Sequence, residues 1–131
     1  MKRFNSSFFS FATLGMLLAL FITSQNHQDP VARIGTLTGG KIAATTFQGF
    51  KGLNATNGTE ACTVISYEMV FVAKKQDPIM SMNREASFNK KSLELVAKAK
   101  SLDCYYFDNV MVKCPGDTEE RKVNSLVFKI N

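Results

Sequence analysis

Residues 88–130 read FNKKSLELVAKAKSLDCYYFDNVMVKCPGDTEERKVNSLVFKI and decide the fold of this chain. Asn89 is a favoured helix N-cap, and the residues after it predict a helix over 90–100. Apolar residues three and four positions apart give that helix its expected buried stripe of Leu93, Val96 and Ala97.

The rest of this stretch predicts the end of a β-sheet. A strand is expected over 104–113, a hairpin loop over 114–120, and a closing strand over 123–130. The apolar alternation of the first strand changes phase at Asp108-Asn109. A β-bulge there would keep four side chains inward: Tyr105, Phe107, Val110 and Val112.

Upstream of residue 88, the sequence predicts further short elements. An edge strand is expected over 31–34, a brief helix capped by Thr45 or Thr46 over 46–53, and a loop over 54–59. A long strand is expected over 62–74 and a short one over 79–83. The long strand's expected core-facing residues are Ile65, Tyr67, Met69, Phe71 and Ala73.

The amino terminus has the layout of a secretory signal peptide. Lys2 and Arg3 precede an apolar run over 8–22, which is short for a bilayer-spanning helix. We therefore expect a signal peptide over 1–24 and one β domain over 25–131, with an uncleaved inner-membrane anchor as the alternative. Removing Lys2 and Arg3 from the 16 basic residues leaves 14 against 11 acidic ones, a net charge of +3.

The chain has three cysteines, a number that cannot pair fully within one molecule. Cys104 and Cys114 bracket one predicted strand, about 33 Å apart if it is straight, which is too far for a disulfide. Cys62 could reach at most one of them. Three independent thiols are the favoured interpretation, with a pair from Cys62 to Cys104 or to Cys114 left open.

No motif indicates catalysis or a cofactor. The one histidine, His27, lies in a polar leader, and one histidine with three scattered cysteines does not give the paired ligand spacing of a zinc site. No phosphate loop or dinucleotide fingerprint occurs. The sequence therefore predicts a protein that is not an enzyme, has no cofactor or metal, and binds neither nucleic acid nor a small-molecule substrate.

Three features are candidates for binding a protein partner. One is the basic helix face, which could meet an acidic surface, and another is a methionine pair of adaptable shape. The third is the acidic hairpin loop. The residues are Lys90, Lys91 and Lys98, then Met80 and Met82, then Asp117, Glu119 and Glu120.

Four landmarks in this order resemble the C-terminal domain of the GldM/PorM family of the type IX secretion and gliding machinery. They are VARIG with GGKI over 31–42, the Phe-containing segment 47–53 before a long strand, the basic helix leading into YYFDNV at 105–110, and PGD at 115–117 followed by LVFKI at 126–130. Together they span roughly residues 29–131.

The resemblance implies a mainly β, immunoglobulin-like sandwich with one or two short helices. It also implies an accessory or adaptor protein that is located in the periplasm or associated with the envelope. The partners it implies are the ring components under the outer membrane, and a homodimer is a further expectation. We expect no counterpart of the family's dimeric rod in this sequence, so we do not extend the rod's mechanical role to it. A stand-alone exported inhibitor or adhesin that shares only the fold is the alternative.

Overall fold

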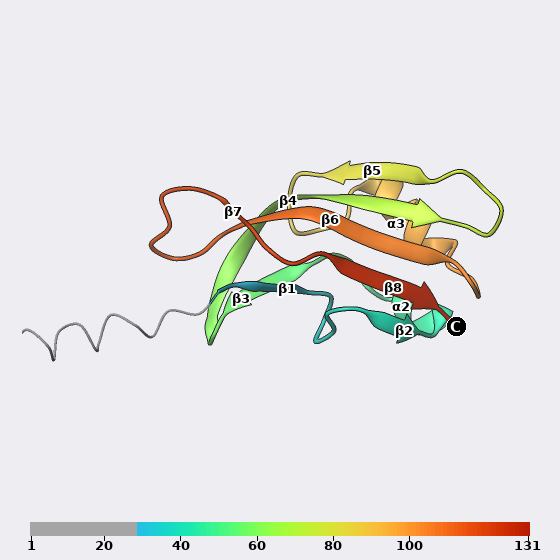
Figure 1. The fold of residues 1–131 in the computed structure, drawn as a ribbon, viewed down its shortest axis with the longest axis horizontal. Helices are drawn as coiled ribbons and strands as arrows, with labels where there is room; N and C mark the ends of the chain where they lie inside the picture. Colours follow the sequence, from blue (N-terminus) through green and yellow to red (C-terminus); the bar gives the residue numbers. More distant parts are fainter. Residues whose placement is uncertain (1–28) are drawn as a thin grey trace, which may run out of the picture.

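The computed structural model describes residues 29–131, which form a mainly β fold with two short helices (Figure 1). The signal peptide expected over 1–24 lies outside the described residues. The elements are β1 Val31–Arg33, β2 Gly40–Ile42, α2 Ala44–Phe47, β3 Asn54–Asn57, β4 Glu60–Val72, β5 Ile79–Asn83, α3 Lys90–Ala97, β6 Cys104–Lys113, β7 Arg121–Lys122 and β8 Leu126–Ile130.

The strands form one mixed sheet in the order β1-β3-β4-β6-β8-β2, with β5 beside β4 and β7 beside β6. Only the β2–β8 pair is parallel among these ladders. The start of β4 pairs with β3 and its later part pairs with β5 and β6. Because β4 curves, β1 and β3 form a second layer below the β5–β4–β6–β8 part, an arrangement consistent with the expected β sandwich (Figure 1).

The bulge predicted at Asp108-Asn109 is confirmed. The β4–β6 register shifts between Ser66 and Glu68, where β6 contains one extra residue, and Asn109 has a φ of 52°. The four predicted inward side chains of β6 are fully buried. A second shift, between Val64 and Ser66, was not predicted; it turns Val64 into the core and leaves Ile65 half-buried.

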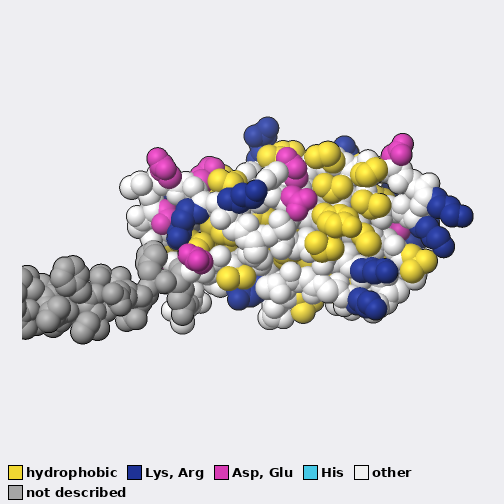
Figure 2. All heavy atoms as spheres, viewed as in Figure 1, with side chains coloured by type: hydrophobic (Ala, Val, Ile, Leu, Met, Phe, Trp, Pro, Cys, Tyr) yellow, Lys and Arg dark blue, Asp and Glu magenta, His cyan; other side chains and the backbone are white. Residues whose placement is uncertain are grey.

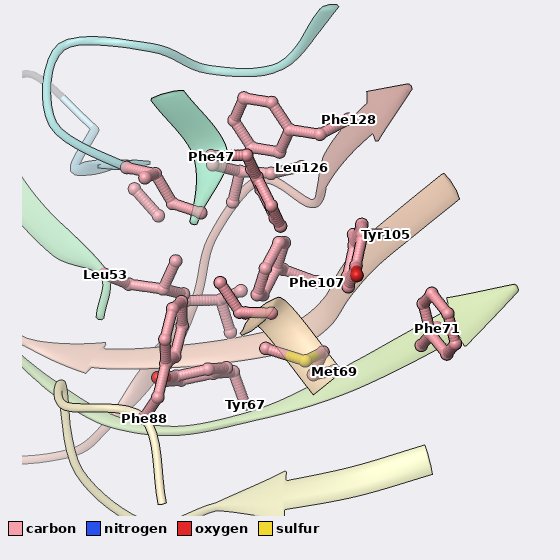
Figure 3. Close-up of a cluster of buried hydrophobic side chains, with 14 of the residues drawn as sticks. Phe47, Leu53, Tyr67, Met69, Phe71, Phe88, Tyr105, Phe107, Leu126 and Phe128 are labelled. Carbon is pink, nitrogen blue, oxygen red and sulfur yellow. The ribbon is translucent and has the colours of Figure 1, made fainter. Parts of the chain in front are cut away.

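Aromatic rings fill the space between the sheet and the helices (Figure 3). The ring centroids of Phe47 and Tyr105 are 4.5 Å apart, and those of Phe88 and Phe107 are 5.9 Å apart in a stacked arrangement. The ring of Phe128 packs against Phe47 in a tilted arrangement and against Phe107 in an edge-to-face arrangement. These contacts tie α2 and the segment before α3 to the inner side of β6 and β8.

The helix expected over 46–53 is wrong in its bounds and its cap. Helix α2 begins at Ala44, has no side-chain cap, and ends at Phe47. Its continuation is prevented because residues 51–53 pair with the chain at 86–88: Leu53 donates to Ala86 and Phe88 donates to Lys51. A Cβ at Gly52 would stand 2.3 Å from the Ala86 oxygen, so this close approach requires glycine.

The helix after Asn89 is confirmed, but only Val96 of its predicted buried stripe is buried. The Asn89 side chain accepts from the Ser92 N–H at 2.8 Å, and the helix ends at Ala97 rather than residue 100. Leu93 is 38% exposed and Ala97 is exposed. Besides Val96, the buried residues are Ser92 and Leu95 in the helix and Ala99 just after it.

A buried hydrogen-bond network explains that rotation of α3. Asn83 donates to the Ser92 hydroxyl at 2.8 Å, and Ser92 donates in turn to the Ser81 hydroxyl at 2.9 Å. The Asn83 side-chain oxygen accepts from the Asn89 N–H. Buried polar groups require such partners, so Ser92 faces β5 in preference to the more apolar Leu93.

Two segments expected to be loop or continuous strand differ from the prediction. Residues 54–57 form β3, and the Asn-Gly signal marks only its hairpin turn, where Gly58 has a φ of 65°. At the carboxyl end the last strand begins at Leu126 rather than residue 123, since residues 121–122 pair with β6 as β7. Val123 remains half-buried between the two strands.

The expectation of three independent thiols is wrong, because Cys62 and Cys114 form a disulfide with Cα atoms 4.2 Å apart. Antiparallel pairing of Thr63 with Lys113 places the two cysteines side by side at the end of the β4–β6 ladder. Cys104, at the other end of β6, is a free and half-buried thiol.

Candidate protein-binding face

The sheet has an outer face, which we define as the side of β5, β4, β6 and β8 away from the aromatic core. An apolar row crosses it at its middle. The ladder registers place Met80 beside Val70, Val70 beside Tyr106, and Tyr106 beside Val127. Met80 is 54% exposed and Val127 45% exposed, while the two residues between them are half-buried.

An acidic row runs parallel to the apolar row, two residues away along each strand. Met82 of β5 lies beside Glu68, and Glu68 lies beside Asp108 of β6. Met82 is 44% exposed. Two residues of strand correspond to about 7 Å, so carboxylates flank the apolar row on one side at that distance.

A basic row lies at the same spacing on the opposite side of the apolar row. Val72 lies beside Cys104, Cys104 beside Lys129, and Lys129 beside Lys41 of β2. Both lysines are exposed. Figure 2 shows this face: hydrophobic side chains gather over β5, β4, β6 and β8, with acidic groups to their left and lysines or arginines at lower right.

The β5 edge of this face is held in place by α3. The Asn89 amide donates to the Met82 carbonyl oxygen at 2.7 Å, while its oxygen caps the helix. The Ser81–Ser92–Asn83 network fixes the intervening inward residues of β5. Met80 and Met82 therefore project outward from a strand that these hydrogen bonds hold against α3. The Met82 carbonyl oxygen already accepts a hydrogen bond, so it is not open to pairing with an added strand.

The candidate residues from the sequence fall in three places and do not form one site. Met80 and Met82 lie on the outer face. The three lysines, Lys90, Lys91 and Lys98, are exposed on and just after α3, which lies behind β4 and β6 in Figure 1.

The acidic loop at 114–120 lies at the far end of the β6–β7 hairpin. Glu119 and Glu120 are exposed there. Asp117 is not a free contact residue, since its Oδ2 accepts from the Cys114 N–H at 2.9 Å and pairs with the Arg121 Nε at 3.1 Å. Its carboxylate therefore shapes the turn beside the disulfide.

Sequence reasoning missed several outer-face residues: Val70, Val72, Tyr106 and Val127. Their signal was present, because apolar residues occupied the strand positions that alternate with the core set. What a single strand cannot reveal is that these positions are in register across four strands. That register depends on the pairing of strands far apart in the chain.

The titratable groups with clear shifts belong to the core rather than to an exposed cleft. Burial, and secondarily the charge of Glu85, raises the pKa of Tyr67, whose hydroxyl donates to the Ala86 oxygen at 2.9 Å. Burial, and secondarily Asp103, raises the pKa of Tyr105, which donates to the Leu95 oxygen at 2.6 Å. Both tyrosines stay protonated and join the sheet to the segments that cover it.

Within residues 29–131 no three His, Cys, Asp or Glu side chains gather closely enough to hold a metal ion. No helix in this range is long and apolar enough to cross a membrane. A scan against protein-family models gave no match for the chain, and a search of curated proteins gave none.

Proposed function

We propose that this chain is an exported, non-enzymatic protein-binding module whose binding surface is the outer face. The observation that carries the proposal is the apolar row Met80–Val70–Tyr106–Val127, which has Glu68 and Asp108 on one side and Lys129 and Lys41 on the other. Contiguous apolar side chains on a surface, rimmed by charge, are typical of protein-interaction sites. Met80 also gives such a surface an adaptable side chain.

Export is supported by the disulfide between Cys62 and Cys114. Disulfides persist in oxidising compartments such as the periplasm and are rare in reducing ones. The amino-terminal order of two basic residues and an apolar run over 8–22 supports the same location. We therefore propose that the protein is located in the periplasm or associated with the envelope.

We further propose that the module is an accessory or adaptor of the type IX secretion and gliding machinery. Support comes from the resemblance to the GldM/PorM C-terminal domain. The quoted landmarks that support it lie on β1–β2, on α2 and the chain leading to β4, on α3–β6, and on the last hairpin with β8. Ring components under the outer membrane are the proposed partners by the same reasoning.

Affinity capture of the tagged full-length protein from envelope extracts tests this function. Wild-type protein is expected to recover secretion or gliding components, and the variant Met80→Glu/Val127→Glu is expected to lose them. Both replaced side chains are exposed, so the fold should tolerate the change. Leu93→Glu, at an exposed position of α3, is the matched control and should capture normally.

Recovery of no secretion or gliding component by wild-type protein would count against the adaptor role. If the mature protein is instead found free in the culture medium, the alternative of a stand-alone exported binding domain is favoured. If the outer-face variant captures the same components as wild type, the binding surface lies elsewhere on the domain.

A further inference from the structure

We propose that one end of the domain, beyond the outer face, binds the surface of an anionic lipid bilayer. We call this surface the basic end, and it consists of two turns, residues 73–78 between β4 and β5 and residues 98–103 between α3 and β6. Its contact residues are Lys74, Lys75, Lys98, Lys100 and Leu102. The inference goes beyond the proposed function, because it concerns another surface and another kind of partner.

The pairing of β4 with β6 brings these two turns together. Val72 lies beside Cys104 at the end of that ladder, so the chain after Val72 and the chain before Cys104 leave the sheet side by side. A cavity of about 370 Å³ lies between the turns, and Gln76, Lys98 and Lys100 all line it. Both turns lie at the right-hand end of Figure 1, where Figure 2 shows dark-blue side chains gathered.

Positive charge prevails at the basic end. Its four lysines are exposed, and within residues 29–131 none of them forms a salt bridge. Of the two acidic residues in these turns, Asp77 is exposed and Asp103 is only 1% exposed. The Asp103 carboxylate accepts from the Lys100 N–H at 3.1 Å, so it closes the turn from inside. Unpaired lysines on long side chains are suited to contact the phosphate groups of a lipid surface.

The backbone at residue 102 suits glycine or asparagine better than the leucine that stands there. The φ of Leu102 is 79°, in the left-handed region, and its side chain is 50% exposed. Hydrogen bonds hold this turn in place: Leu102 N–H donates to the Ile130 oxygen at 2.9 Å, and Ile130 N–H donates to the Asp103 oxygen at 2.9 Å. A strained, exposed apolar residue on a fixed turn points to a contact outside the chain.

A lipid surface fits these features better than an acidic protein does. The apolar part of the basic end is the single side chain of Leu102, whereas protein interfaces use a contiguous apolar patch of complementary shape. A bilayer accepts one apolar side chain at the level of its headgroups without such a fit, while lysines around it contact lipid phosphates. Clusters of roughly four to eight basic residues recognise anionic lipids, so four lysines predict weak, salt-sensitive binding.

Co-sedimentation of purified protein with lipid vesicles tests the proposal. At about 50 mM salt, wild type should bind vesicles that contain about 30% phosphatidylglycerol, and it should leave them at about 500 mM salt. It should not bind vesicles of phosphatidylcholine alone. The variant Lys98→Glu/Lys100→Glu should bind the anionic vesicles at least about tenfold more weakly.

The matched control is Lys113→Glu/Lys122→Glu, which changes the net charge by the same amount. Lys113 ends β6 far from the basic end, and Lys122 lies in β7, which pairs with that part of β6. Both lysines are exposed, so the fold should tolerate the change. This control should bind anionic vesicles like wild type, because its charges do not face the lipid.

Leu102→Asn separates lipid binding from folding. Asparagine suits the φ of 79°, so the variant should be at least as stable as wild type. It should nevertheless bind anionic vesicles roughly tenfold more weakly, because the inserted apolar side chain is lost. This variant also decides the test if the lysine variant does not fold.

The proposal is overturned if wild type does not bind the anionic vesicles, or if either basic-end variant binds them as tightly as wild type. Wild type that ignores the vesicles but is retained on immobilised polyglutamate would assign the basic end to an acidic protein instead. Met80→Glu/Val127→Glu, which should lose envelope capture, should still bind vesicles. Failure of the lipid proposal is therefore distinguishable from failure of the proposed function.

Discussion

Asn124 and Ala32 are joined by two hydrogen bonds across 92 residues of sequence. The Asn124 amide donates to the Ala32 carbonyl oxygen at 3.1 Å, and the Ala32 N–H donates to the Asn124 Oδ1 at 2.8 Å. One side chain therefore pairs with the backbone of β1 as an added strand would. It links β1, at one end of the sheet order, to the segment that leads into β8.

Replacing Asn124 with alanine should destabilise the domain by about 1–2 kcal/mol, since two partly buried hydrogen bonds are lost. Urea unfolding followed by circular dichroism measures this free energy of unfolding. Ser125→Ala, at the exposed neighbouring position, should change it little. Equal stability of Asn124→Ala and Ser125→Ala would mean that the pairing with β1 adds nothing.

Loss of the disulfide should have a larger effect. The double variant Cys62→Ala/Cys114→Ala is expected to lose about 2–4 kcal/mol of unfolding free energy, because the bridge closes a loop between residues 52 positions apart. Cys104→Ala is the control and should be nearly neutral, since Cys104 is unpaired. Thiol titration of unfolded wild type should find one free thiol; three would contradict the pairing.

The hydrogen-bond network between β5 and α3 predicts that Ser92 contributes to the stability of the domain. Ser92→Ala leaves the Asn83 amide without its 2.8 Å acceptor in a buried site, which should cost about 1–3 kcal/mol. Leu93→Ala, one residue later on the exposed side of α3, should be close to neutral. If the Leu93 variant proved the more destabilising of the two, the observed rotation of α3 would be wrong.

The buried tyrosines predict a loss of stability in alkali. The pKa values of Tyr67 and Tyr105 are raised above the ordinary 10.0, so the unfolded state releases these protons first. Their contribution is intact below about pH 10 and is lost as pH rises toward the folded values, at about 1.4 kcal/mol per pH unit for each tyrosine. Tyr67→Phe should reduce this slope by half, and an unchanged slope would contradict the assignment.

Local signals predicted much of the inner architecture. Asn89 marked the start of α3, the phase change at Asp108-Asn109 marked the bulge, and alternation over 79–83 matched β5. Each of these depends on residues within about one turn of helix or a few residues of strand. Such features are set locally, so they are readable from the chain.

The predictions that were wrong concern features set by contacts between residues far apart in the sequence. Helix α2 ends early because residues 51–53 pair with 86–88, and α3 turns Ser92 inward because Asn83 and Ser81 lie opposite. The Cys62–Cys114 bond and the three rows of the outer face likewise depend on which strands become neighbours. A pattern within one segment does not contain that information.

The rate at which Cys104 is alkylated tests most directly whether the outer face is a binding surface. In intact envelopes, the thiol should react roughly tenfold more slowly than in dilute purified protein, as expected if the face is covered nine-tenths of the time. A cysteine placed at Leu93 in a Cys104→Ser background should react at the same rate in both. Equal rates for Cys104 in the two settings would contradict the account.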